Sequence, residues 1–169
     1  MKKIISLLFL FVFYNSAQAL DLSSPICQTD KEPQFESFGV NENVKSGEIA
    51  GSLVFLGKRT KKYKTVIAND ANRGVNFSGH FRVVTWGCGT DCHQFAIINI
   101  KDRTVFMSNF IELIAGAMGN DEDRISFRPD SSLIVFNGSI NDEVEGKFFF
   151  KWKSGRLFFL CRSKLIKDS

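Results

Sequence analysis

The order of apolar and polar residues predicts hairpins of β-strands in the second half of the chain. Residues 80–87 and 92–100 are rich in Val, Ile, Phe and Trp, and turn-forming residues separate them at 89–91. Two such runs with a three-residue connection predict a β-hairpin. Residues 147–152 and 156–161 predict another, because Gly155 stands in the turn between them where a positive φ is favoured.

Shorter apolar runs predict further strands. These are residues 47–57, 104–107, 125–127 and 133–136. The turn between the last two contains Pro129 and Asp130, both typical turn residues. Residues 110–118 fit either a short helix or an apolar loop, and residues 137–146 are predicted to form a polar loop.

One segment, residues 60–73, has helical spacing. Its Tyr, Val, Ile and Ala side chains recur every three or four positions, Thr60 can cap its start, and Gly74 suits a left-handed stop. Strands joined by short turns and covered by one helix predict an α+β fold that is mainly β, an antiparallel meander of hairpins. We expect both tryptophans, Trp86 and Trp152, to belong to the core.

The start of the chain has the three parts of a secretory signal peptide over residues 1–19. Lys2 and Lys3 precede an apolar stretch, and Ala17-Gln18-Ala19 forms a small-x-small cleavage site. The apolar stretch, residues 4–14, is shorter than the about 20 residues of a membrane-spanning helix. We expect a polar N-terminal arm at 20–47, one β-rich domain at 48–169, a periplasmic or secreted location, and no transmembrane segment after cleavage.

Charge gives no reason to expect a nucleic acid as partner. Removing residues 1–19 takes away two lysines and no acidic residue, which lowers the formal net charge from +4 to +2. A nearly balanced chain lacks the basic footprint of nucleic-acid-binding domains. A basic run does occur at 58–64, and it is predicted to be a solvated helix face.

The four cysteines, Cys27, Cys88, Cys92 and Cys161, all follow the predicted cleavage site. An even number in an exported chain favours disulfides. The short spacing favours a local Cys88–Cys92 bridge, which leaves Cys27–Cys161 to join the two ends of the domain.

Residues 80–93 contain both histidines and two of the cysteines, and three interpretations compete there. A zinc site would use His80, Cys88, Cys92 and His93, although their spacing matches no common zinc finger. A thiol nucleophile would be Cys88 or Cys92 with a histidine base. A structural disulfide would close the hairpin and leave the histidines and Asp91 without a catalytic role.

Strand geometry favours the structural disulfide. If residues 89–91 form the turn, Cys88 faces Cys92, Trp86 faces Gln94 and Val84 faces Ala96. His93 then pairs with Gly87 and lies on the opposite face from both cysteines. His80 lies seven residues before Gly87, about 23 Å from the tip at roughly 3.3 Å per residue. We therefore predict no catalytic residue, no cofactor and no metal, with an alternative catalytic set of His80, Cys88, Asp91, Cys92 and His93.

Several motifs together resemble a group of small exported proteins of Gram-negative bacteria. They are Asn76-Phe77-Ser78-Gly79-His80, the run Trp86-Gly87-Cys88-Gly89-Thr90 with Cys92, Phe127-Arg128-Pro129-Asp130-Ser131 and Phe150-Lys151-Trp152. The resemblance covers residues 58–160. It implies periplasmic export and a shared fold, and it carries over no catalytic residue.

Three hypotheses for function remain open. The first is a non-enzymatic binding or structural module of the cell envelope, whose partner is an envelope protein or a small ligand. The second is a hydrolase or thiol–disulfide enzyme centred on the hairpin at 80–93. The third is a metal-binding protein.

Overall fold

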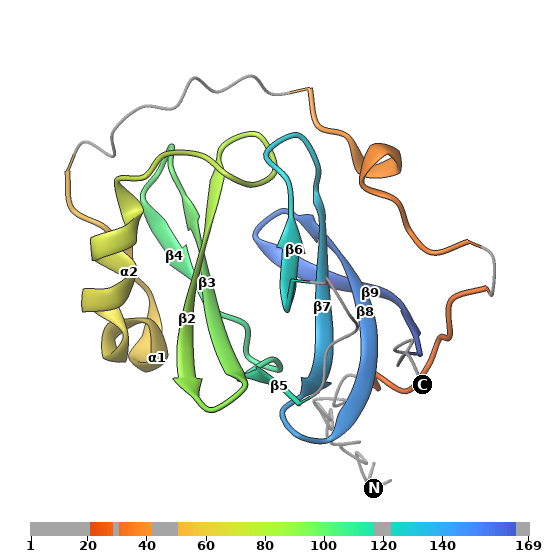
Figure 1. Cartoon of the computed structure of the whole chain (residues 1–169). Helices are drawn as coiled ribbons and strands as arrows, with labels where there is room; N and C mark the ends of the chain where they lie inside the picture. The colour runs from red at the N-terminus through yellow and green to blue at the C-terminus, as the bar shows by residue number, and fades with distance from the viewer. Residues whose placement is uncertain (1–20, 29–30, 42–50, 117–122, 165–169) are drawn as a thin grey trace, which may run out of the picture.

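The computed structural model describes residues 21–28, 31–41, 51–116 and 123–164, and it is mainly β. The predicted signal peptide lies outside the described residues. The α+β class is confirmed (Figure 1), with two differences from the expected meander. The sheet is mixed, because β1 (Val54–Phe55) pairs in parallel with β4 (Thr104–Phe106). The helical segment is divided into α1 (Gly57–Lys62) and α2 (Lys64–Ala71).

The strands form two groups that a short strand connects. In the first group, β3 (Cys92–Asn99) pairs with β2 (Phe81–Gly89) and with β4. In the second, β7 (Leu133–Ile140) pairs with β6 (Ile125–Phe127) and β8 (Val144–Lys153), and β8 pairs with β9 (Arg156–Ser163). Strand β5 (Ile114–Ala115) joins the groups by pairing with both β3 and β7.

Along most of its length the β2–β3 hairpin has the predicted register, with Trp86 paired with Gln94 and Val84 with Ala96. At the tip, the predicted pairing of Cys88 with Cys92 across a turn at 89–91 is wrong. Gly89 pairs with Cys92 instead, because a bulge lies beside Cys88 and the turn holds only residues 90 and 91.

Both groups of strands are buried on both faces, and this explains their nearly continuous apolar runs. In β8, Phe148 and Phe150 point into the core between the groups, whereas Phe149 packs on the opposite face. In β3, Phe95 and Ile97 belong to the same inner core. Ala96 and Ile98 alternate with them and belong to the cluster under the helices.

The helices cover the outer face of the first group. Ile67 and Ala71 of α2 pack against Val84 of β2 and against Ala96 and Ile98 of β3. The predicted cap at Thr60 is wrong. Thr60 lies inside α1, where its hydroxyl donates to the Leu56 carbonyl at 2.7 Å instead of capping a helix start.

Three other predicted boundaries change. Of residues 47–57, the described part contains only the two-residue β1. Of residues 110–118, the described part has no helix, and it contains β5. The predicted loop at 137–146 is mostly strand, because β7 continues to Ile140 and β8 begins at Val144.

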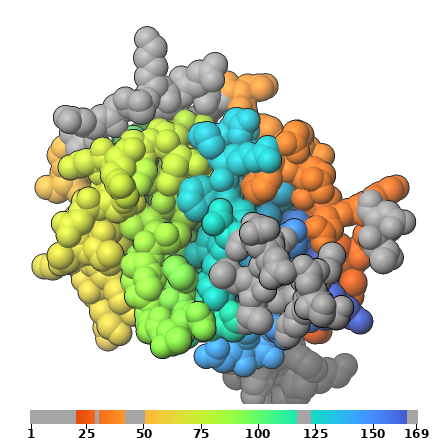
Figure 2. All heavy atoms as spheres, viewed as in Figure 1, coloured from red at the N-terminus to blue at the C-terminus, as the bar shows by residue number. Residues whose placement is uncertain are grey.

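The N-terminal arm covers the outer face of the second group. A 3₁₀ turn, Phe35–Phe38, packs with the apolar cluster of Leu133, Val135 and Phe149. Cys27 and Cys161 are disulfide-bonded, with Cα atoms 5.0 Å apart, which joins the arm to β9 as predicted. Figure 2 shows the arm and the helices on opposite flanks of the molecule. None of the helices among the described residues is long and apolar enough to cross a membrane.

Candidate functional site

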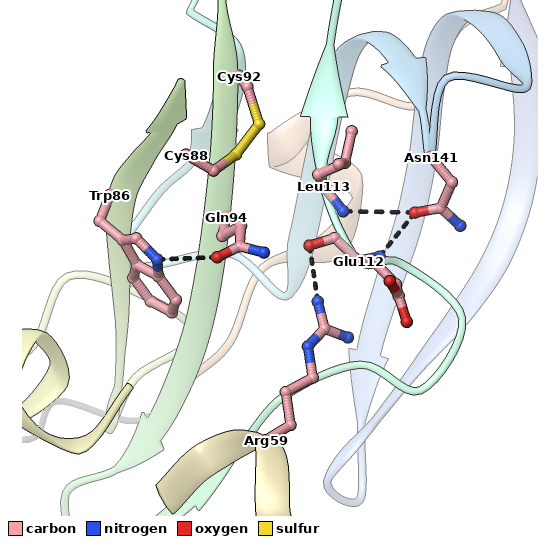
Figure 3. Close-up of a disulfide and its surroundings, with 8 residues drawn as sticks. All are labelled: Arg59, Trp86, Cys88, Cys92, Gln94, Glu112, Leu113 and Asn141. Carbon is pink, nitrogen blue, oxygen red and sulfur yellow. Dashed lines mark hydrogen bonds between the residues drawn. A yellow bond between two sulfur atoms is a disulfide. The ribbon is translucent and has the colours of Figure 1, made fainter. Parts of the chain in front are cut away.

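The predicted local disulfide closes the tip of the β2–β3 hairpin (Figure 3). Cys88 and Cys92 are bonded, with Cα atoms 5.2 Å apart. Asp91 is exposed in the turn with a φ of 50°. Because both sulfurs are in the disulfide, neither cysteine is available as a thiolate nucleophile in this state.

Polar side chains around the disulfide hold the local backbone together. Trp86 Nε1 donates to Gln94 Oε1 at 3.0 Å (Figure 3). Arg59 of α1 donates to the carbonyl oxygens of Ser108 and Glu112, at 2.7 and 2.6 Å. Arg59 therefore differs from the lysines of the basic run at 58–64, which are exposed as predicted. These hydrogen bonds connect α1 to the segment before β5 and connect β2 to β3.

The residues of the alternative catalytic set do not come together. His93 pairs with Ile114 of β5, and its Nδ1 is buried without a hydrogen-bond partner. His80 lies just before the start of β2, at the end away from the disulfide, and the Ile100 amide donates to its carbonyl at 3.0 Å. Within the described ranges, no three His, Cys, Asp or Glu side chains gather closely enough to hold a metal ion.

A cleft of about 970 Å³ lies at the His80 end of the hairpin. Strand β5 connects the two strand groups near the disulfide end, where it pairs with His93 (Figure 1). At the other end, β4 and the end of β3 face the β8–β9 turn with the cleft between them. Its lining includes aromatic residues and a polar set, Ser78, His80, Asn99, Asp102, Thr104, Asn109 and Ser132.

Three aromatic side chains belong to the apolar lining of the cleft, together with aliphatic residues. Trp152 packs edge-to-face against Phe81 and Phe106, with ring centroids 5.3 and 5.0 Å apart. Trp152 is 4% exposed, and the two phenylalanines are half-buried. Their contacts fix the rings in place before any ligand arrives.

The indole N–H of Trp152 is a buried donor without a partner. Trp152 lines the cleft, yet its Nε1 makes no hydrogen bond, whereas Nε1 of Trp86 is bonded to Gln94. Buried tryptophan N–H groups usually have a partner, and an orphaned one is unfavourable. An acceptor atom of a ligand in the cleft would remove this penalty.

Asp102 gives the cleft a fixed negative charge. Its Oδ1 accepts hydrogen bonds from the backbone amide and hydroxyl of Thr104, and its Oδ2 accepts one from Asn99 at 3.0 Å. The Thr104 hydroxyl bond is the main cause that lowers the pKa of Asp102 below its ordinary value, and the charge of His80 adds to the effect. The carboxylate is therefore ionised at neutral pH.

From the sequence, Trp152 is predicted to lie in the core, and nothing predicts a role for Asp102. The burial of Trp152 is correct, but its membership in a cleft depends on the distant strand β4. Because a buried tryptophan N–H usually has a hydrogen-bond partner, Trp152 could have been recognised from the sequence as a residue whose partner had to be found. Whether a partner exists depends on how the two strand groups pack.

Comparison of the chain with protein-family models, with curated proteins and with solved structures finds no match.

Proposed function

We propose that this chain is an exported, non-enzymatic binding protein of the cell envelope, which holds a small ligand in the cleft beside Trp152. The observation that carries this proposal is an unpartnered indole N–H on Trp152, a residue that lines the cleft. Ligand pockets of ~300–1,000 Å³ that combine apolar walls with a few fixed polar groups are typical small-molecule sites. The two disulfides are compatible with an extracytoplasmic location, and we place the protein in the periplasm.

The arrangement of the site supports binding over catalysis. The aromatic rings and the Asp102 cluster are held by contacts within the protein. The residues of the alternative catalytic set lie at opposite ends of the β2–β3 hairpin. A concave site also favours a small ligand over a protein partner, which would require a broader surface.

The test uses Trp152 as the reporter. Trp86→Phe leaves Trp152 as the only tryptophan, since the chain has two. In this background, a library of small metabolites is screened by the NMR signal of the indole N–H. We expect at least one compound to shift this signal saturably, because a ligand in the cleft changes the environment of the donor.

Asn109→Tyr supplies the blocking variant, because Asn109 lines the cleft from an exposed position. Asn69→Tyr on the exposed face of α2 is the matched control. Binding should weaken at least tenfold in the first and remain unchanged in the second. A hit that Asn109→Tyr does not weaken, or a screen without any saturable hit, would contradict the proposal.

A further inference from the structure

We propose that the ligand is a neutral saccharide, whose ring packs on Phe81 and Phe106 and whose hydroxyl groups bridge Trp152 and Asp102. This inference rests on the proposed binding function and specifies its ligand. It uses three features of the cleft, which are its aromatic wall, its hydrogen-bonding groups and its charge.

The hydrogen-bonding groups require a ligand that both donates and accepts. Trp152 Nε1 can only donate. The Asp102 carboxylate can only accept when ionised, and Asn99 donates to its Oδ2 at 3.0 Å. A hydroxyl group can do both, and a saccharide carries several hydroxyls on one rigid ring.

The aromatic wall requires an apolar ligand face. Phe81 and Phe106 line the cleft, and their edge-to-face contacts with Trp152 hold them in position. A pyranose ring presents C–H groups on its faces and hydroxyls at its rim. A ligand with apolar faces and a polar rim matches a cleft in which aromatic rings lie near Asn99, Asp102 and Thr104.

The Asp102 carboxylate disfavours anionic ligands. Asp102 is ionised at neutral pH and would repel a carboxylate or phosphate. Among the described lining residues, basic side chains are limited to His80 and the exposed Lys153. The cleft therefore lacks the paired arginines that planar anions favour. Its volume also suits a short oligosaccharide better than a single ring.

The experiment compares three probes on the disulfide-bonded protein carrying Trp86→Phe. Maltotriose is the neutral saccharide, decanoate the anionic amphiphile, and benzyltrimethylammonium the cation that an aromatic–carboxylate site would favour. We expect saturable shifts of the Trp152 indole signal with maltotriose, and binding at least tenfold weaker for the other two.

Two variants test the assigned contacts. Asp102→Asn should weaken maltotriose binding at least tenfold, while Asp142→Asn, an exposed carboxylate in the β7–β8 turn, should leave it unchanged. Replacing Trp152 by benzothienylalanine, whose sulfur takes the place of the N–H, should weaken binding about fivefold, the loss expected for one hydrogen bond. Calorimetry provides the readout for this variant.

The outcomes separate this inference from the proposed function. Saturable binding of decanoate or benzyltrimethylammonium without maltotriose binding would overturn the saccharide and keep the binding function. Failure of all three probes also overturns the saccharide, and the metabolite screen then decides the binding function by itself. Maltotriose binding that Asp102→Asn leaves unchanged would overturn the assigned contacts.

Discussion

The two tryptophans show how the same side chain takes different roles at the scale of single residues. Both belong to apolar clusters. Trp86 packs against Tyr63 with ring centroids 5.1 Å apart and satisfies its N–H through Gln94. Trp152 is packed more deeply but leaves its N–H without an acceptor. The protein therefore satisfies the N–H of Trp86 and leaves that of Trp152 without a partner.

Because only Trp86 has a hydrogen-bond partner for its N–H, removing the N–H should affect stability differently at the two positions. Benzothienylalanine at position 86 should lower the free energy of unfolding by about 1 kcal/mol, because the Gln94 oxygen loses its donor. The same replacement at position 152 should leave the ligand-free protein equally stable or more stable, because no bond is lost. Urea unfolding measures both. A larger loss at position 152 than at position 86 would show that its N–H has a partner in the free protein.

At the scale of elements, the two disulfides constrain the chain very differently. Cys27–Cys161 joins residues 134 apart in sequence and attaches the N-terminal arm to β9. Cys88–Cys92 joins residues only 4 apart at an exposed hairpin tip that the β2–β3 register already aligns. The loop that a disulfide closes in the unfolded chain largely sets its contribution to stability.

We therefore expect unequal losses when the pairs are removed. Chain-entropy arguments give about 5 kcal/mol for replacing Cys27 and Cys161 by Ala, and about 2 kcal/mol for Cys88 and Cys92. Urea unfolding of the two double variants measures the difference. Mild reductant followed by alkylation and mass spectrometry should label Cys88 before Cys27, because Cys88 is exposed and Cys27 is buried. Equal losses in the two double variants would contradict this account.

At the scale of the whole molecule, the layers explain why one end is open. Helices, two strand groups and the arm stack so that each strand group is covered on both faces. The strand groups are connected through β5 near the disulfide end. The opposite end holds the cleft, where Phe106 of β4 meets Trp152 of β8.

Export is the prediction that belongs to the whole chain. Expressed in a Gram-negative host and released by osmotic shock, the protein should begin at Leu20 and contain no free thiol. N-terminal sequencing and thiol counting measure this. Ala19→Arg should block cleavage and leave the longer form in the membrane fraction, whereas Gln18→Arg, at the variable position of the site, should be processed. A cytoplasmic protein that retains Met1 would contradict the signal-peptide prediction.

Local chemistry was enough to predict the hairpins, both cysteine pairs and most of the β2–β3 register, but not the bulge at its tip. The alternation of β-branched and aromatic residues and the short turns depend on neighbours in the sequence, so they could be recognised without tertiary structure. The helix was predicted over residues 60–73 as one element. The structure instead has α1 from Gly57 and α2 to Ala71, because nothing in the predicted range marked the interruption at Tyr63.

The cleft was decided only by tertiary structure. Trp152, Phe81 and Phe106 are far apart in the sequence, and only the packing of the second strand group against the first brings them together. The burial of Trp152 could be predicted from its aromatic character. The absence of a hydrogen-bond partner for its N–H could not be predicted, because it depends on which atoms of distant strands lie beside the indole nitrogen.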